Sequence, residues 1–176
     1  MTAVIERPRL TVPVSERDHV IGPVTAAVTL LEYGDYECPF CGAAHPIVKH
    51  VREIVGDDLR FAYRHFPLTQ IHTHAYQAAE AAGAQGRFWQ MHDTLFENQD
   101  RLGLRDLISY ADALGLDLER FVTDMRNGTY AGRLREDFMS GIRSGVNGTP
   151  TFFVNGNRHN GNWDIESLLE AVRAEL

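Results

Sequence analysis

The pattern of apolar and polar positions predicts a strand, a helix and a second strand in the first third of the chain. Residues 28–33 form a nearly continuous apolar run rich in β-formers, as is typical of a strand buried on both faces. Residues 59–64 alternate between apolar and polar side chains, which predicts another strand. Between them, Pro39 suits the first turn of a helix, and the apolar positions that follow repeat at helical spacing up to Val55.

The remainder of the chain is predicted to be helical first and then to return to strands. From about residue 74 to residue 144 apolar positions repeat at helical spacing, which predicts four or five helices. Residues 151–154 are rich in β-formers, and an Asn-Gly hairpin turn separates them from a return strand over residues 157–160. Asp164 is a candidate N-cap for a last helix that extends to the C-terminus.

Size and composition indicate a single α/β domain with an N-terminal arm. The chain has 176 residues, of which 44% are hydrophobic, so it can bury one substantial core. Proline and glycine are frequent in residues 1–24, which predicts an extended arm with a short edge strand over residues 10–14.

Charge and terminal sequence limit the partners and the compartment that we expect. Lys and Arg number 17 against 24 Asp and Glu, giving a net charge of -7 without a basic block, so we expect neither nucleic acid nor a membrane as a partner. Residues 1–14 lack the apolar stretch of a signal peptide. As written, the chain is expected to be cytoplasmic, and it would be exported if a leader had been removed.

Both cysteines lie in one tetrapeptide, Cys38-Pro39-Phe40-Cys41, at the start of the first predicted helix. A structural zinc site would need further ligands, and there is no second CxxC, although His45 is near enough to be considered. A structural disulfide across so short a loop would remove little entropy from the unfolded chain. In the cytosol a CxxC is more often catalytic than structural. The pattern therefore favours a redox-active dithiol, and no metal or cofactor is expected.

Three other histidines have simpler interpretations. His65 ends a predicted strand and is expected to be a hydrogen-bonded residue of the core or its rim. His72 and His74 begin the helical region, where a local capping role is favoured over metal binding. Phosphate-binding motifs of the GxGxxG or Walker type are absent from the sequence.

The order of elements, with the CxxC opening a helix and Thr149-Pro150 opening the third strand, resembles the thioredoxin fold with a helical insertion. More closely, it resembles the DsbA-like thiol:disulfide oxidoreductases. The segments that carry this resemblance are residues 34–41, 63–68 and 145–151. The resemblance implies a thioredoxin-like core at about 25–67 and 145–176, with the helical insertion at about 73–144.

Roles follow for the residues around the dithiol. Cys38 is predicted to be the nucleophile, because a helix N-terminus favours its thiolate, and Cys41, one turn later, is predicted to be the resolving thiol. The resemblance implies that Glu32 is a buried acid that moves protons to and from Cys41; the alternative is an edge-strand carboxylate facing water. It also implies that Pro150 is cis and that the backbone of Thr149 pairs with an extended substrate; the alternative is a trans proline at an edge strand.

The tetrapeptide also departs from the resemblance. The best-known members carry a histidine inside the CxxC, where this chain has Phe40 after Pro39, so their oxidising power does not carry over. Asp35 and Glu37 either act as like charges on the Cys38 thiolate or are solvated loop charges. We therefore expect Pro39 and Phe40 to shape a site of milder redox character.

The leading hypothesis is an enzyme that exchanges disulfides with cysteine-containing proteins or peptides. A thioredoxin- or glutathione-type partner would recycle it. The alternative is a redox-sensing or chaperone-like binding module in which the CPFC pair is a switch. Glutathione-dependent relatives of this fold replace the first cysteine by serine, so Cys38 argues against transferase chemistry.

Overall fold

The computed structural model describes residues 8–69 and 74–176. Its strands are β1 (His19–Ile21), β2 (Val28–Gly34), β3 (Leu59–His65), β4 (Thr151–Val154) and β5 (Asn157–Arg158). Its helices are α1 (Pro39–Val55), the short 3-10 helix η1 (Gly56–Asp58), α2 (His74–Gly83), α3 (Phe88–Glu97), α4 (Leu104–Ala113), α5 (Leu118–Asn127), α6 (Ala131–Arg143) and α7 (Ile165–Arg173). The predicted α/β fold class is confirmed.

Strand β2 is at the centre of the sheet, whose order is β1-β3-β2-β4-β5. It runs parallel to β3 and antiparallel to β4, so that Glu32 lies between Tyr63 and Phe152. A parallel pair of this kind needs a crossover connection, which α1 provides. The apolar run at residues 28–33 is therefore a strand buried on both faces, as predicted.

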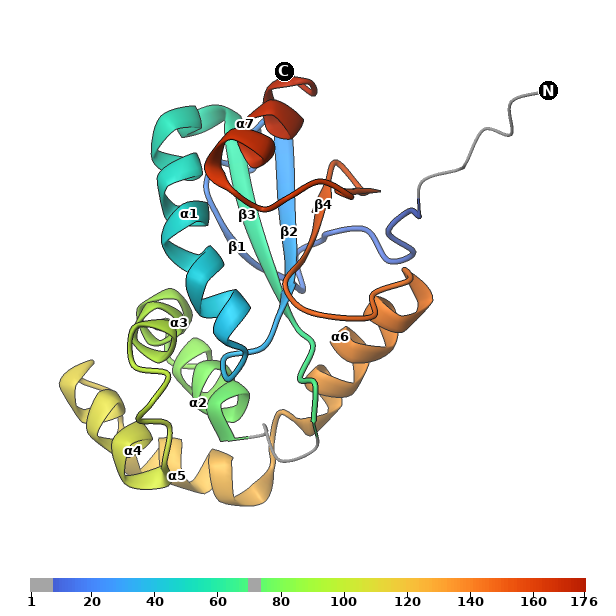
Figure 1. Cartoon of the computed structure of the whole chain (residues 1–176). Helices are drawn as coiled ribbons and strands as arrows, with labels where there is room; N and C mark the ends of the chain where they lie inside the picture. The colour runs from blue at the N-terminus through green and yellow to red at the C-terminus, as the bar shows by residue number, and fades with distance from the viewer. Residues whose placement is uncertain (1–7, 70–73) are drawn as a thin grey trace.

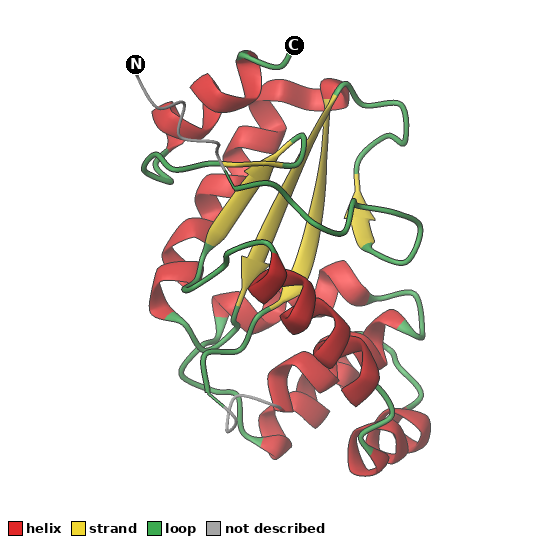
Figure 2. Ribbon diagram, turned by 90° about the vertical axis from the view of Figure 1, so that its right-hand side faces the viewer, coloured by secondary structure: helices red, strands yellow, loops and turns green. Residues whose placement is uncertain are grey.

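Segments of the chain pack on both faces of the sheet (Figures 1 and 2), where their side chains form two apolar clusters. On one face, alternate residues of β2 and β3 pack with α1, α7 and the helices α2 to α5 in the larger core cluster. On the other face, Leu31, Tyr33 and Ala62 pack with Phe66, Val146 and Phe153, and the partly buried Phe138 of α6 contacts this second cluster. The helices α2 to α5 gather below the carboxyl ends of β2 and β3, next to the first turn of α1 (Figure 1). In the described residues, no helix is long and apolar enough to cross a membrane.

The N-terminal arm differs from its prediction. Residues 10–14 form no strand, and the edge strand is β1, which pairs antiparallel with β3. The main-chain oxygens of Val12 and Pro13 instead accept hydrogen bonds of 2.8 and 3.1 Å from the guanidinium of Arg64. The same guanidinium forms a fully buried ion pair with Asp18, with N–O distances of 2.8 and 3.0 Å. The described part of the arm is thus held by the Arg64 side chain and by an isolated β-bridge between Arg9 and Asn157, without a regular strand.

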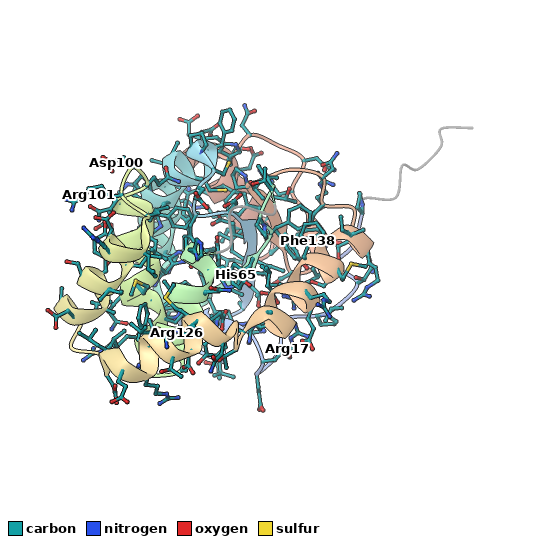
Figure 3. All side chains as sticks on the ribbon, turned by 90° about the horizontal axis from the view of Figure 1, so that it is seen from below. Arg17, His65, Asp100, Arg101, Arg126 and Phe138 are labelled. Atoms are coloured by element: carbon teal, nitrogen blue, oxygen red, sulfur yellow. The ribbon has the colours of Figure 1, made fainter. Side chains whose placement is uncertain are left out.

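His65 is a buried, hydrogen-bonded residue, as expected from the sequence (Figure 3). Its Nε2 lies 2.7 Å from Oε1 of Glu80 on α2, and its main-chain N–H donates to Asp137 on α6 at 3.1 Å. The end of β3 is therefore tied to helices on both sides. His74 is the exposed first residue of α2, and His72 lies outside the described residues. The predicted return strand is shorter than 157–160, since only Asn157–Arg158 pairs with β4.

Candidate active site

The two cysteines lie at the N-terminus of α1. Cys38 is the N-cap residue, in an extended conformation, and Pro39 occupies the first helical position, where no N–H is needed. The first turn closes with a 3.1 Å hydrogen bond from the Gly42 N–H to the Cys38 carbonyl. Both cysteines are free thiols, Cys38 being 3% exposed and Cys41 fully buried. The helix dipole and the unpaired N–H groups of this first turn favour a negative charge at Cys38.

The loop before β4 brings Thr149 to the first cysteine. The Thr149–Pro150 peptide bond is cis. The Cys38 thiol contacts the carbonyl oxygen of Thr149 at 3.5 Å, although 111 residues separate them in sequence. The Oγ1 of Thr149 is buried, and a hydrogen bond from the Thr149 side chain offsets part of the rise that burial causes in the pKa of Cys41. Residues 38 and 149 therefore face each other with main-chain groups close to the sulfur.

Glu32 is buried on the face of β2 that packs against α1. It is 2% exposed, and burial raises the pKa of its carboxyl to about 8. Its Oε1 atom and the Tyr63 hydroxyl are both buried without a hydrogen-bond partner in the described part of the chain. The two atoms converge on Gly34, because a Cβ built there would lie 2.9 Å from Oε1 and 2.8 Å from the hydroxyl. The alternative of an edge-strand carboxylate facing water is wrong.

Cys41 is coupled electrostatically to this carboxyl. Burial raises the pKa of the Cys41 thiol well above its ordinary value, and the charge of Glu32 raises it further. Ionising either group therefore disfavours ionising the other. The arrangement suits a single proton that is exchanged between a resolving thiol and a buried acid.

Asp35 belongs to the loop that precedes α1 and is not a solvated charge. It is 4% exposed, and its two oxygens accept main-chain hydrogen bonds of 2.9 Å from Glu37 and from Leu68. The carboxylate therefore holds the turn before Cys38 against the segment after β3. Of the two alternatives for Asp35, the solvated loop charge is therefore wrong.

Gln99, which follows α3, is a functional candidate that the sequence did not reveal. Its Nε2 donates to the carbonyl oxygens of Tyr36 at 2.7 Å and Cys38 at 2.9 Å. The side chain lies over Gly42, where a Cβ would come within 2.0 Å of the Gln99 Oε1. A single amide thus connects the helical region to both sides of the nucleophile, across about 60 residues of sequence.

We expect Gln99→Ala to slow thiol exchange and to reduce stability, because it removes two hydrogen bonds from the loop that holds Cys38. The free energy of unfolding should fall by roughly 1–2 kcal/mol. Gln85→Ala is the matched control, since Gln85 also bonds two main-chain atoms, those of Asp117, at 2.8 and 3.2 Å. Urea unfolding should show similar losses for both variants, and only Gln99→Ala should slow the reaction with a model disulfide. Equal exchange rates in the two variants would exclude a positioning role.

The structure brings five of the candidate residues together and leaves two at the rim. Cys38, Cys41, Glu32, Thr149 and Pro150 lie around the N-terminus of α1. Pro39 and Phe40 are exposed beside them, and Phe40 is 63% exposed.

An apolar groove of about 450 Å³ begins nearby, at the segment that Asp35 holds. Its lining residues are Pro67, Leu68, Thr69, Tyr76, Ala131, Leu134, Arg135 and Phe138.

Comparison with curated proteins finds long relatives that contain a similar segment. Residues of this chain are 50% identical over 169 positions to a protein named Na(+)/H(+) antiporter NhaA 1 from Salinispora arenicola (strain CNS-205). The match covers 93% of this chain but 26% of that protein. The chain thus spans about a quarter of the length of the curated relatives it matches.

Solved structures and one family model match nearly the whole chain. A thioredoxin-like oxidoreductase from Silicibacter pomeroyi DSS-3 is 27% identical, with a TM-score of 0.81 over 91% of this chain and 92% of that one. Alpha-DsbA1 from Wolbachia pipientis is 19% identical and shares the fold, with a TM-score of 0.79 over 94% and 93% of the two chains. A family model described as Thioredoxin matches residues 14–174. The chain therefore belongs to the thioredoxin family and has the DsbA-like form of its fold.

Proposed function

We propose that this chain is a thiol-disulfide oxidoreductase that exchanges disulfides with protein or peptide cysteines through Cys38 and Cys41. The observation that carries the proposal is the position of the Cys38 thiol, at a helix N-terminus and 3.5 Å from the Thr149 carbonyl. A helix N-terminus stabilises a thiolate, the species that attacks a disulfide. The second thiol, three residues later and buried, is within the same turn for the resolving step.

In the reducing direction the reaction has two steps. The Cys38 thiolate attacks one sulfur of a substrate disulfide, forming a mixed disulfide and releasing the first substrate thiolate. Cys41 then passes its proton to Glu32 and attacks the Cys38 sulfur, which releases the second substrate thiolate and leaves a Cys38–Cys41 disulfide. Two electrons pass from the enzyme to the substrate. The oxidising direction is the exact reverse, in which Glu32 returns the proton to Cys41.

An extended, partly apolar peptide segment is the substrate that fits this site. The main chain at Thr149 lies beside the nucleophile and offers the polar groups with which an extended segment pairs. Phe40 is exposed at the rim, and the apolar groove begins at Pro67 and Leu68. Side chains that flank the substrate cysteine would contact these surfaces.

A second redox protein or a small thiol of the thioredoxin or glutathione type would recycle the Cys38–Cys41 pair. The oxidoreductase role is proposed for this chain, whereas the name Na(+)/H(+) antiporter belongs to longer proteins of which the chain matches about a quarter. The alternative of a redox-sensing or chaperone-like module differs in requiring no turnover.

The proposal is tested by catalytic reduction of insulin disulfides with a thiol reductant in excess. Turnover at substoichiometric protein is expected, and its absence would favour the sensor over the enzyme. The equilibrium reduction potential of the Cys38–Cys41 pair against glutathione then gives the direction. With Phe40 offering no hydrogen-bond donor to the sulfur, we expect a potential well below the value of about -120 mV that characterises the strongest oxidants. A value near -120 mV would contradict the expected mild character.

A further inference from the structure

Two histidines and an aspartate form a compact cluster between α1 and α3. His45, on α1, faces His92 and Asp93, on α3, and one ligand atom from each lies within 4.8 Å of the others. The Nε2 of His45 is 3.3 Å from Oδ1 of Asp93. The sequence predicts no metal site, because the three residues come from helices far apart in the chain. The fold nevertheless brings together the nitrogen and oxygen donors that zinc prefers.

The first observation that points to a ligand is His45 itself. It is 7% exposed, and its Nε2 contacts only the Asp93 carboxylate among the described residues, in a geometry short of a well-aligned hydrogen bond. A poorly aligned imidazole–carboxylate pair is a weak hydrogen bond, and a metal ion between the two atoms would bond to both. Two donors bonded to one tetrahedral zinc at about 2.0–2.1 Å lie about 3.3–3.4 Å apart. The observed 3.3 Å separation of His45 and Asp93 has this length.

The second observation is how the other two side chains are held. Nδ1 of His92 is 2.9 Å from the Tyr36 hydroxyl, which fixes the orientation of the ring. Oδ2 of Asp93 accepts a 3.0 Å hydrogen bond from Lys49, which orients the carboxylate and leaves Oδ1 toward His45.

An entry path is present on one side of the cluster. His45 and Lys49 line a surface cavity of about 690 Å³, which also contains His50, Glu53 and Glu97. An ion could reach the cluster from this cavity, and water could occupy the fourth position. The charges of Lys49 and Arg52 near Asp93 oppose a cation, so the affinity should be moderate and should rise when Lys49 is neutralised.

We propose that His45, His92 and Asp93 form a binding site for a divalent transition-metal ion of the zinc type, with water as the fourth ligand. Binding draws the third ligand atom inward by roughly 1–1.5 Å, from the observed separations to those of a tetrahedral site. The ion would bridge the helix that carries the dithiol to the helical region. Through Tyr36, which precedes Cys38 by two residues, it would also stiffen the active-site loop.

The test is a zinc titration of the oxidised protein, in which the Cys38–Cys41 disulfide removes both thiols as ligands. Calorimetry should give one equivalent of bound Zn²⁺, and the melting temperature should rise with zinc concentration because only the folded state holds the site. Replacing an outer-shell partner costs about 10–100-fold in affinity, so His45→Gln and Asp93→Asn should each cost roughly 100-fold or more. Substituted Co²⁺ should give a visible ligand-field band in the wild type and not in His45→Gln or Asp93→Asn.

His50→Gln is the matched control, because His50 lies on the same helix, lines the same cavity and has a side chain that is 54% exposed. It should bind zinc as the wild type does. The proposal is overturned if the oxidised wild type shows no saturable binding. It is also overturned if His45→Gln and Asp93→Asn bind normally, in which case the three residues only link the helices. Asp93→Asn preserves shape at a half-buried position, so it tests the site without disturbing the core.

Discussion

Replacing Cys38 by serine is expected to reduce insulin-disulfide reduction to the uncatalysed rate. The serine hydroxyl does not ionise near neutral pH, so the first mixed disulfide cannot form. We expect a loss of roughly 10³-fold or more, equivalent to about 4 kcal/mol of transition-state stabilisation. This loss is measured as the rate of insulin reduction, coupled to NADPH or to a thiol reductant, at fixed protein concentration.

Cys41→Ser should behave differently, and the contrast identifies the two roles. Cys38 can still attack a peptide disulfide and release one peptide thiolate, but no internal thiol resolves the product, so the mixed disulfide with the peptide should accumulate. Intact-mass spectrometry should detect this adduct in Cys41→Ser and not in Cys38→Ser. Adduct formation by Cys38→Ser through the fully buried Cys41 would reverse our assignment.

Glu32→Gln is expected to change the pH dependence of both the reaction and the stability. In the wild type, the step in which Cys41 attacks the mixed disulfide should accelerate with rising pH and level off above about 8, where Glu32 is ionised. The variant should lose this inflection and react about 10²-fold more slowly at neutral pH, a typical loss for a missing general base. Stopped-flow resolution of a preformed mixed disulfide between pH 5 and 10 measures the profile.

The stability effect follows from the raised pKa of Glu32. The folded protein keeps the proton up to about pH 8, whereas the unfolded chain releases it near 4.5, so between these values the folded state binds more protons. Wild-type stability should therefore fall as pH rises through this window, by on the order of 5 kcal/mol in total. Glu32→Gln should lack this fall.

The exposed residue Glu53 provides the control, because its side chain is 73% exposed. Glu53→Gln should leave the rate profile and the pH dependence of stability as in the wild type. If Glu32→Gln also retains the wild-type profile, Glu32 is a buried residue without a role in proton transfer.

The elements around the site could be predicted because their signals are local. Pro39 at the first helical position and the apolar repeat up to Val55 define α1, and both are visible in a short window of sequence. Asp164 was identified as an N-cap from its residue type, and its side chain accepts the expected hydrogen bond from Ser167. The strand at residues 28–33 was predicted from its apolar run alone, and β2 extends it by one residue.

The features that could not be predicted depend on contacts between distant segments. The edge strand β1 has three residues and exists because it pairs with β3, whereas the pattern at residues 10–14 looked more strand-like. Glutamine is a common residue type on protein surfaces, so nothing in the local sequence marks Gln99. Its positioning role depends on hydrogen bonds to two carbonyl groups about 60 residues away. The burial of Asp35 could not be predicted for the same reason, since Leu68, one of its donors, is 33 residues distant.

The buried Arg64–Asp18 pair also determines where this domain can be divided from a longer protein. Two of the oxygens that bind the guanidinium belong to Val12 and Pro13, upstream of the region that the thioredoxin family model matches. A fragment cut at residue 14 would retain the buried arginine but lose these two acceptors, and a buried cation with unsatisfied N–H groups is costly. In fusion with another protein, the junction therefore belongs before residue 12, and Val12 and Pro13 are part of the folding unit rather than of a linker.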